Sequence, residues 1–181
     1  MRVISGTARG LKLDSIEGLD TRPTLDNVKE AVFSMLFDKV YGAVCLDLFA
    51  GSGALGIEAL SRGASGCVFC DKSDRAISVI KKNTEKSRVS DKSQILKNDF
   101  KDCLEHLKIE GEKFDIVFLD PPYANGLLDG ALKMIYDMSL LSSGGVVVAE
   151  YDNGTDVDIQ HYNILKDKKY GRVCIYILEA Q

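Results

Sequence analysis

Histidine is scarce in this sequence of 181 residues, and two common kinds of site lack the side chains that they need. The two histidines are His106 and His161, and no Gly-x-Ser-x-Gly segment is present, so a hydrolytic triad has little support. Cys67 and Cys70 form a Cys-x-x-Cys pair, but there is no second pair to complete a zinc site. Since five cysteines cannot all pair and most lie in apolar segments, we expect reduced core thiols and no bound metal.

Long apolar runs are missing too, and so is an excess of basic residues. No apolar segment has the length of a membrane helix, and the first residues lack the layout of a signal peptide, so we expect a cytoplasmic protein without membrane contact. The chain has 23 basic and 27 acidic residues and a net charge of -4, whereas nucleic-acid-binding proteins are usually basic. A nucleic acid would therefore have to bind to a local patch of basic residues. Candidates are the basic residues Lys81, Lys82, Lys86, Arg88, Lys166, Lys168, Lys169 and Arg172, although such runs usually form solvated helix or turn faces.

The remaining segments alternate between helix and strand along the chain. Expected helices cover residues 25–40, 54–62, 74–87, 100–107 and 127–138, and expected strands cover 44–48, 66–70, 93–97, 114–119, 146–150, 162–166 and 173–178. This order predicts an α/β fold with a doubly wound, mostly parallel sheet and a terminal antiparallel hairpin. The length suits one domain over residues 1–181, with an N-terminal extension over 1–42 and a core over 43–181.

The residues Asp120-Pro121-Pro122-Tyr123 directly follow the apolar strand expected at 114–119. The exocyclic amine of a purine is a poor nucleophile because its lone pair is delocalised into the ring. The Asp120 carboxylate and the Pro121 carbonyl can accept its two N–H bonds and draw that pair out of conjugation. Tyr123 offers a flat face to the base. The proline after Asp120, Pro121, also stiffens the turn, and the four residues including Pro122 therefore indicate methylation of an amino group, although an ordinary tight turn is the structural alternative.

A second motif lies upstream, where the strand at 44–48 passes into a helix through a glycine-rich turn. Gly51 and Gly53 allow positive φ and close approach of a ligand, and the amides that open the helix can meet an anionic group. The spacing also fits a dinucleotide fingerprint, which is the competing interpretation. An acid inside the strand, Asp47, favours S-adenosylmethionine, because we expect an apolar residue there in a nicotinamide enzyme. Phe49 and Ser52 are further candidates for cofactor contact.

Two more acids follow strands at the same expected edge of the sheet. Asp71 follows the strand at 66–70, and its carboxylate can accept hydrogen bonds from both ribose hydroxyls of a nucleoside cofactor. Asp99 follows the strand at 93–97 and can accept from the adenine amino group, with Phe100 packed near the adenine ring. Each acid has a structural alternative at the start of the next helix, Asp71 as a favourable charge and Asp99, or Asn98, as the cap.

The N-terminal extension carries a small set of basic residues. Arg2, Arg9 and Lys12 precede the first acid, Asp14, in a segment expected to form a hairpin, and they favour contact with phosphate. A solvated edge hairpin explains the same residues equally well. Arg22 precedes a proline that restricts the chain, so its guanidinium can be held near the active site to contact RNA phosphate or the substrate base. A structural salt bridge is its main alternative.

Three segments agree in order and spacing with one known family. They are Thr21-Arg22-Pro23-Thr24-Leu25-Asp26-Asn27-Val28-Lys29-Glu30, Asp47-Leu48-Phe49-Ala50-Gly51-Ser52-Gly53 and Asp120-Pro121-Pro122-Tyr123. Together they resemble the RsmD-type bacterial methyltransferases, and the resemblance extends over nearly the whole chain. It implies a seven-stranded Rossmann-like fold, S-adenosylmethionine as cofactor without a metal, and methylation of guanine N2 in small-subunit (16S) ribosomal RNA.

The resemblance also implies a partner. We expect 16S rRNA to be bound within the small ribosomal subunit or an assembly intermediate, by a monomeric enzyme. The Asp-Pro-Pro-Tyr motif is shared with DNA adenine and protein glutamine methyltransferases, so methylation of adenine N6 in DNA or of a protein amide is the main alternative. An NAD-dependent dehydrogenase is a further alternative, which depends on the glycine spacing alone.

Overall fold

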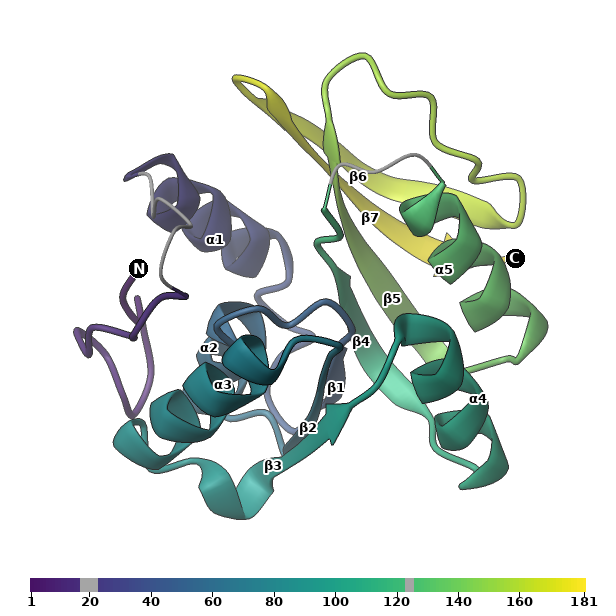
Figure 1. Cartoon of the computed structure of the whole chain (residues 1–181). Helices are drawn as coiled ribbons and strands as arrows, with labels where there is room; N and C mark the ends of the chain where they lie inside the picture. The colour runs from purple at the N-terminus through teal and green to yellow at the C-terminus, as the bar shows by residue number, and fades with distance from the viewer. Residues whose placement is uncertain (17–22, 123–125) are drawn as a thin grey trace.

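The computed structural model describes residues 1–16, 23–122 and 126–181, and its centre is a seven-stranded sheet (Figure 1). The strands lie in the order β3-β2-β1-β4-β5-β7-β6. Their bounds are β1 Val44–Asp47, β2 Gly66–Asp71, β3 Ser93–Lys97, β4 Phe114–Leu119, β5 Leu141–Asp152, β6 Tyr162–Tyr170 and β7 Val173–Ala180. Strands β1 to β5 are parallel, while β7 is antiparallel to both β5 and β6. The prediction of a mostly parallel sheet with a terminal hairpin is confirmed.

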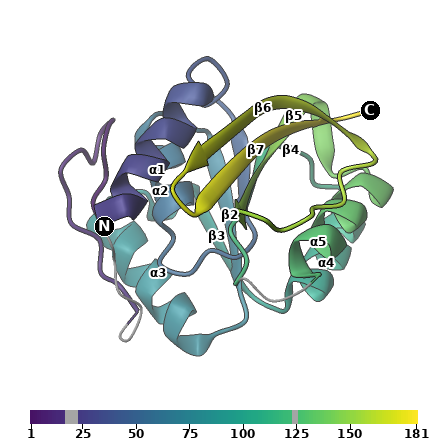
Figure 2. The same ribbon diagram turned by 90° about the horizontal axis from the view of Figure 1, so that it is seen from above.

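Helices cover both faces of this sheet (Figures 1 and 2). On one face lie α1 Pro23–Met35, α2 Ala54–Ser61 and α3 Asp74–Lys86, and on the other lie α4 Phe100–Ile109 and α5 Leu127–Asp137. Side chains alternate between the faces along each strand, so Ile116 and Phe118 of β4 pack on the α1 side while Val117 and Leu119 pack on the α4 side. Burial on both faces explains why the central strands are apolar throughout.

The chain changes direction across the sheet between β1 and β4. From β1 the order runs outward through β2 to β3, and the chain then returns to place β4 on the other side of β1. The connections after β1 and β4 therefore leave in opposite directions, onto opposite faces. In doubly wound sheets ligands bind at such a switch point, outside the carboxyl ends of the strands.

Residues 1–16 form a short arm that packs against α2 and α3. Arg2 and Lys12 form an isolated antiparallel bridge, so the expected hairpin is present although its regular pairing is limited to that bridge. Gly6 has a φ of +83°, and a Cβ added there would lie 1.7 Å from the Ser61 carbonyl oxygen. The same oxygen accepts a hydrogen bond from the Thr7 amide at 2.8 Å. The arm therefore approaches the end of α2 too closely for any side chain at Gly6.

The predicted end of the first helix is wrong by several residues. The apolar spacing continues to Val40, but α1 ends at Met35, and the Lys39 amide donates to the Leu36 carbonyl at 2.8 Å in a turn. Leu36 and Val40 are nevertheless both buried in the same core as the helix. The apolar spacing therefore predicted correctly that Leu36 and Val40 are buried. A turn buries these two side chains as well as a further turn of helix would.

Two strands are longer than expected. β5 begins at Leu141 and passes through Gly145, where an added Cβ would lie 2.8 Å from the Phe114 carbonyl oxygen, so this glycine allows the two strands to meet at a register shift. β6 continues to Tyr170 because the hairpin turns only at the next two residues, where Gly171 has a φ of +66°. Lys168 and Lys169, which lie between the strands expected at 162–166 and 173–178, are therefore part of β6.

The five cysteines are free and buried, which confirms the prediction of core thiols. Cys67 and Cys70 pack into cores on opposite faces of the sheet, so this Cys-x-x-Cys pair cannot share a ligand. In the parts of the chain that the structure describes, no group of three histidine, cysteine or acidic residues is placed to hold a metal ion. No helix there has both the length and the apolar character required to cross a bilayer.

Gly56→Ala should destabilise the protein, because an added Cβ would lie 2.3 Å from Cε1 of Phe69 and 2.6 Å from Sγ of Cys67. Overpacking of this kind costs about 1–3 kcal/mol. At Gly130 of α5 the nearest atom, in the Phe100 ring, is 3.7 Å away, so Gly130→Ala should be neutral or stabilise by up to about 1 kcal/mol. Urea unfolding of both variants measures the difference. Equal stabilities would contradict the tight packing of α2 on β2.

Candidate active site

A cavity of about 790 Å³ lies at the carboxyl ends of the parallel strands, within the size range of small-molecule sites. Most of the residues predicted for cofactor and catalysis line it. They are Asp47, Phe49, Gly51, Ser52, Asp71, Asp99, Phe100, Asp120, Pro121 and Pro122. The structure therefore brings together residues that are up to 75 positions apart in the sequence (47 to 122).

Asp47 lies at the closed end of this cavity. Its side chain is 2% exposed, and its Oδ2 accepts a hydrogen bond from the Gly56 amide at 3.0 Å. Burial raises the pKa of Asp47 to about 7, against the effect of that amide, and the charges of Asp120 and Asp71 add to the rise. The protein alone thus gives the Asp47 carboxylate fewer donors than an ionised acid can accept from, which suits a cationic ligand group.

The glycine loop and Asp71 form one hydrogen-bonded unit. Gly51 and Gly53 have φ values of +54° and +78°, as the sequence predicts, and Gly53 is the N-cap residue of α2, behind the lining residues. Oδ2 of Asp71 accepts from the Gly51 amide at 2.9 Å, and Oδ1 accepts from the Ser73 amide at 2.9 Å. Each carboxylate oxygen has a further lone pair, so Asp71 can still accept from ribose hydroxyls. Ser73, not Asp71, caps α3.

Asp99 and Phe100 form the wall beside β3. Asp99 caps α4 by accepting a hydrogen bond from the Lys101 amide at 3.1 Å, which confirms the capping alternative, and it also lines the cavity. The rings of Phe49 and Phe100 lie 5.5 Å apart and are tilted by 43°. They form an aromatic surface on which a flat heterocycle can pack.

The segment after β4 lies across the cavity from that wall. The Asp120 side chain is accessible through the cavity, yet protein surrounds it on enough sides that desolvation raises its pKa to about 6. Pro121 is buried and Pro122 is exposed. Tyr123, the fourth predicted member of the motif, lies outside the residues that the structure describes.

The predicted RNA-contacting residues do not line the cavity. Arg2, Arg9 and Lys12 are exposed on the arm, and none belongs to the cavity wall as the described residues define it. Arg22 lies outside the described residues. Other parts of the arm do reach the site, since Met1, Ser15 and Ile16 line it.

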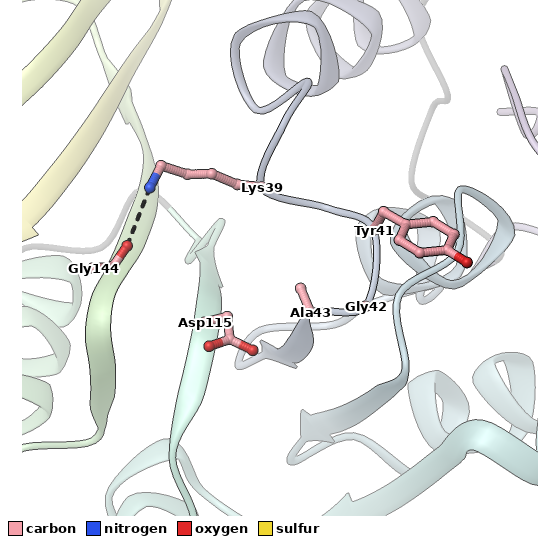
Figure 3. Close-up of a pocket in the computed structure, with 6 residues that line it drawn as sticks. All are labelled: Lys39, Tyr41, Gly42, Ala43, Asp115 and Gly144. Atoms are coloured by element: carbon pink, nitrogen blue, oxygen red, sulfur yellow. Dashed lines mark hydrogen bonds between the residues drawn. The ribbon is translucent and has the colours of Figure 1, made fainter.

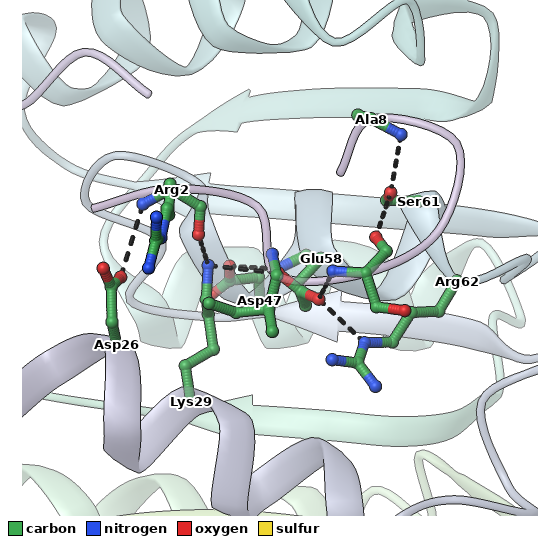
Figure 4. Close-up of polar contacts among 11 residues, drawn as sticks. Arg2, Ala8, Asp26, Lys29, Asp47, Glu58, Ser61 and Arg62 are labelled. Carbon is green, nitrogen blue, oxygen red and sulfur yellow. Dashed lines mark hydrogen bonds and ion pairs between the residues drawn. The ribbon is translucent and has the colours of Figure 1, made fainter. Parts of the chain in front are cut away.

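A buried ionic cluster ties the arm to the cavity wall (Figure 4). Lys29 of α1 lines the cavity and is 2% exposed. Its Nζ donates to the Arg2 carbonyl at 2.6 Å and pairs with the Glu58 carboxylate at 3.1 Å. Glu58 also accepts from the amides of Ile4 and Ser5 at 2.8 and 3.0 Å. Desolvation lowers the pKa of Lys29, and the Glu58 charge opposes that shift.

Six polar lining residues were not predicted as site residues from the sequence: Ser15, Lys29, Lys72, Ser73, Asn98 and Glu150. Glu150 had an available signal, because it follows the apolar run of β5 in the same way that Asp71, Asp99 and Asp120 follow theirs. Lys29 is a charged residue next to Glu30 in an amphipathic helix, and charged residues of such a helix are ordinarily expected to be solvated. Its burial depends on the acid of another helix, which no local pattern reveals.

A second hollow, of about 260 Å³, lies at the opposite end of the sheet (Figure 3). It is bordered by the α1–β1 connection, by Asp115 of β4 and by Gly144 of β5. The Lys39 ammonium donates to the Gly144 carbonyl at 3.1 Å, and Asp115 accepts from the Val44 amide at 2.8 Å. These contacts hold the starts of the strands together. None of the predicted site residues that line the larger cavity borders this second hollow.

A family described as Conserved hypothetical protein 95 matches residues 1–179 of the chain. The chain belongs to this family, that of the RsmD-type methyltransferases. Among its relatives, YlbH of Bacillus subtilis is 41% identical over 157 residues, which cover 87% of this chain and 85% of that protein. Ribosomal RNA small subunit methyltransferase D of Escherichia coli is 34% identical over 186 residues, which cover 100% and 91%.

The solved structure of the Escherichia coli protein yhhF agrees with the fold over the whole length of the chain. Its TM-score is 0.85 at 32% identity, and the match covers 100% of this chain and 99% of that one. Family and fold confirm the prediction of an S-adenosylmethionine-dependent methyltransferase, and the dehydrogenase alternative is wrong. The cavity fits this cofactor, since it combines an aromatic surface with several carboxylates around a site for a cation.

Asp47→Asn should change how stability depends on pH. The folded-state pKa of Asp47 is raised to about 7 from 3.8, so its favourable contribution is complete below about pH 4 and is lost as pH rises through 7. Asparagine keeps an acceptor for the Gly56 amide and stays neutral. The variant should therefore come within about 1 kcal/mol of the parent at pH 4 and exceed it by about 1–4 kcal/mol at pH 8, since the loss is spread between pH 4 and pH 7. Urea unfolding of the ligand-free proteins at both pH values measures this, and an equal effect at both would contradict it.

Proposed function

We propose that this protein methylates the exocyclic N2 amino group of a guanine in small-subunit (16S) ribosomal RNA, by direct transfer from S-adenosylmethionine. The observation that carries the proposal is the position of Asp120 and Pro121 on the same cavity as the glycine loop and the strand-end acids. An amine acceptor and the cofactor can therefore meet in one enclosed space. The names of the full-length relatives support ribosomal RNA as the substrate class.

We assign the cofactor-binding roles as follows. Asp71 accepts from the ribose hydroxyls, Asp99 from the adenine amino group, and the Phe49 and Phe100 rings pack against the adenine. Asp47, with Gly51, Ser52 and Gly53, faces the amino-acid end. When bound, S-adenosylmethionine supplies a methyl group activated by the positive charge on its sulfur.

Asp120 orients and activates the amine. Its carboxylate accepts one N–H of the guanine N2, and the Pro121 carbonyl accepts the other, so the nitrogen lone pair is turned toward the methyl carbon. As the N–C bond forms, the bond from the methyl carbon to sulfur would break, leaving neutral S-adenosylhomocysteine, and the positive charge would pass to this nitrogen, where the negative charge of Asp120 stabilises it. Asp120 can then hold the proton that the amine releases. A pKa of about 6 leaves Asp120 ionised at neutral pH and yet basic enough for this role.

Guanine N2 lies on the Watson–Crick edge, so the target base must be unpaired or flipped out before it can enter the cavity. Pro122 and Tyr123 are proposed to hold the plane of that base, Tyr123 by stacking. Residues 1–42 form the proposed RNA-contacting extension, with Arg2, Arg9, Lys12 and Arg22 toward phosphate. With a net charge of -4, the protein is expected to act as a monomer on a folded subunit or assembly intermediate rather than on short naked RNA.

Asp120→Asn should lower the transfer rate by about 10²-fold or more while the affinity for S-adenosylhomocysteine stays within about threefold of the parent. In the parent, the rate should fall as pH drops through about 6, because protonation removes the charge of Asp120. The control is Asp115→Asn, at the other end of the same strand, which should leave the rate unchanged. A near-parent rate in Asp120→Asn would falsify the mechanism.

The substrate is tested with labelled S-adenosylmethionine and small ribosomal subunits from cells that lack this protein. After nucleoside digestion and mass analysis, the label is expected in N2-methylguanosine of the small-subunit RNA. If the protein binds S-adenosylhomocysteine but labels no nucleoside, guanine N2 is the wrong target, and DNA adenine and protein amides become the acceptors to test.

A further inference from the structure

The outer strands of the sheet continue the cavity wall toward solvent. On the face that carries α1, register places three rows of residues across β5, β7 and β6. The rows are Val148, Ile177 and Lys166; then Glu150, Ile175 and Lys168; then Asp152, Val173 and Tyr170. Val148, Glu150 and Ile175 line the cavity. Lys166 and Lys168 are therefore the next side chains beyond that wall.

These three β6 residues, Lys166, Lys168 and Tyr170, are here called the β6 strip. Alternate residues of a strand share a face, so the two lysines lie roughly 7 Å apart along β6, and Lys168 lies roughly 10 Å across the sheet from Glu150. Both lysines are exposed, and Tyr170 is half-buried against the same core as α1. The hairpin tip lies on the α1 side of the sheet in both Figure 1 and Figure 2.

The charges near the strip leave its lysines available for a ligand. In the described parts of the chain, neither Lys166 nor Lys168 lies within ion-pair distance of a carboxylate. Asp152, in the row of Tyr170, pairs with Arg172 at 2.8 Å. Asp167 and Lys169 stand opposite Tyr176 and Cys174, on the other face of the sheet. Positive charge is therefore presented on the cavity face by two lysines in line.

We propose that the β6 strip binds the RNA backbone beside the target nucleotide, with Lys166 and Lys168 on phosphates and Tyr170 against a neighbouring base. This inference rests on the proposed function. A line of cations with an aromatic side chain is the arrangement that binds single-stranded nucleic acid without regard to sequence. Since Lys168 lies only roughly 10 Å from Glu150, an RNA strand on the strip would pass close to the cavity that Glu150 lines. The strip lies beyond β5, while the arm borders the cavity through Met1, Ser15 and Ile16.

The competing role for these lysines is protection of an exposed edge. β6 is the last strand of the sheet, and lysines on such a strand discourage pairing with another chain. Edge protection needs charge on either face of β6, whereas RNA binding needs it on the cavity face alone. Lys169 is thus a matched control, since it lies on the same strand with the same charge and is exposed on the opposite face.

The experiment compares Lys166→Glu/Lys168→Glu with Lys169→Glu in the full-length protein. The Kd for small ribosomal subunits from cells lacking the protein is measured by co-sedimentation over a range of salt concentrations. The double variant should bind at least tenfold more weakly, and its slope of log K against log salt should be smaller by about 1.4, the value for two phosphate contacts on a single strand. Lys169→Glu should stay within twofold of the parent.

Separate measurements distinguish the possible failures. Affinity for S-adenosylhomocysteine and the urea midpoint should be unchanged in both variants, which excludes a folding defect as the cause. Equal subunit affinity in the double variant and Lys169→Glu would overturn the assignment, as would self-association with unchanged affinity of the monomer. If the parent binds subunits but transfers no methyl group, the proposed function fails, while the Kd comparison still decides whether the strip binds RNA.

Discussion

The contact between α2 and the strands beneath it is the constraint on which the rest of the site depends. Because Gly56 has no side chain, the helix lies directly on Cys67 and Phe69 of β2. This closeness brings the Gly56 amide within 3.0 Å of Asp47 and fixes the loop that joins them. The same helix carries Glu58 and Ser61, which hold the N-terminal arm through backbone amides. One short helix thus connects the cofactor loop with the arm.

The cavity wall carries more negative than positive charge, since five acids and two lysines line it and one of these lysines, Lys29, is paired with Glu58. Desolvation raises the pKa of Asp47 and of Asp120, and the charges of Asp120 and Asp71 raise the pKa of Asp47 further. The cofactor brings a sulfonium and an ammonium group, and an amine that accepts a methyl group becomes transiently cationic. Ionising the carboxylates therefore costs less free energy when these positive groups are bound beside them. This is expected of a pocket that is complementary to a cationic transition state.

The sequence was sufficient to predict the order of elements and most of the cavity wall, because both follow from local patterns. An acid at the end of a strand or just after it marks the edge of a parallel sheet, and this held for Asp47, Asp71, Asp99 and Asp120. Applied to β5, the same pattern would also have found Glu150. Lys29 could not be found in this way, since its burial depends on Glu58 of another helix. The end of α1 was mispredicted because a turn buries Leu36 and Val40 as well as a helix does.

A protein of net charge -4 can bind RNA only if its charges are separated in space. Here five acids line the cavity, while Arg2, Arg9, Lys12, Lys166 and Lys168 are exposed on the arm and on β6. Under the proposed function, phosphates would be attracted to the arm and to β6 and repelled by the acids of the cavity, whereas a flipped base, which carries no charge, could enter. This separation favours entry of the base over its backbone. It also explains why net charge is a poor guide to the ligand of an enzyme whose cofactor is a cation.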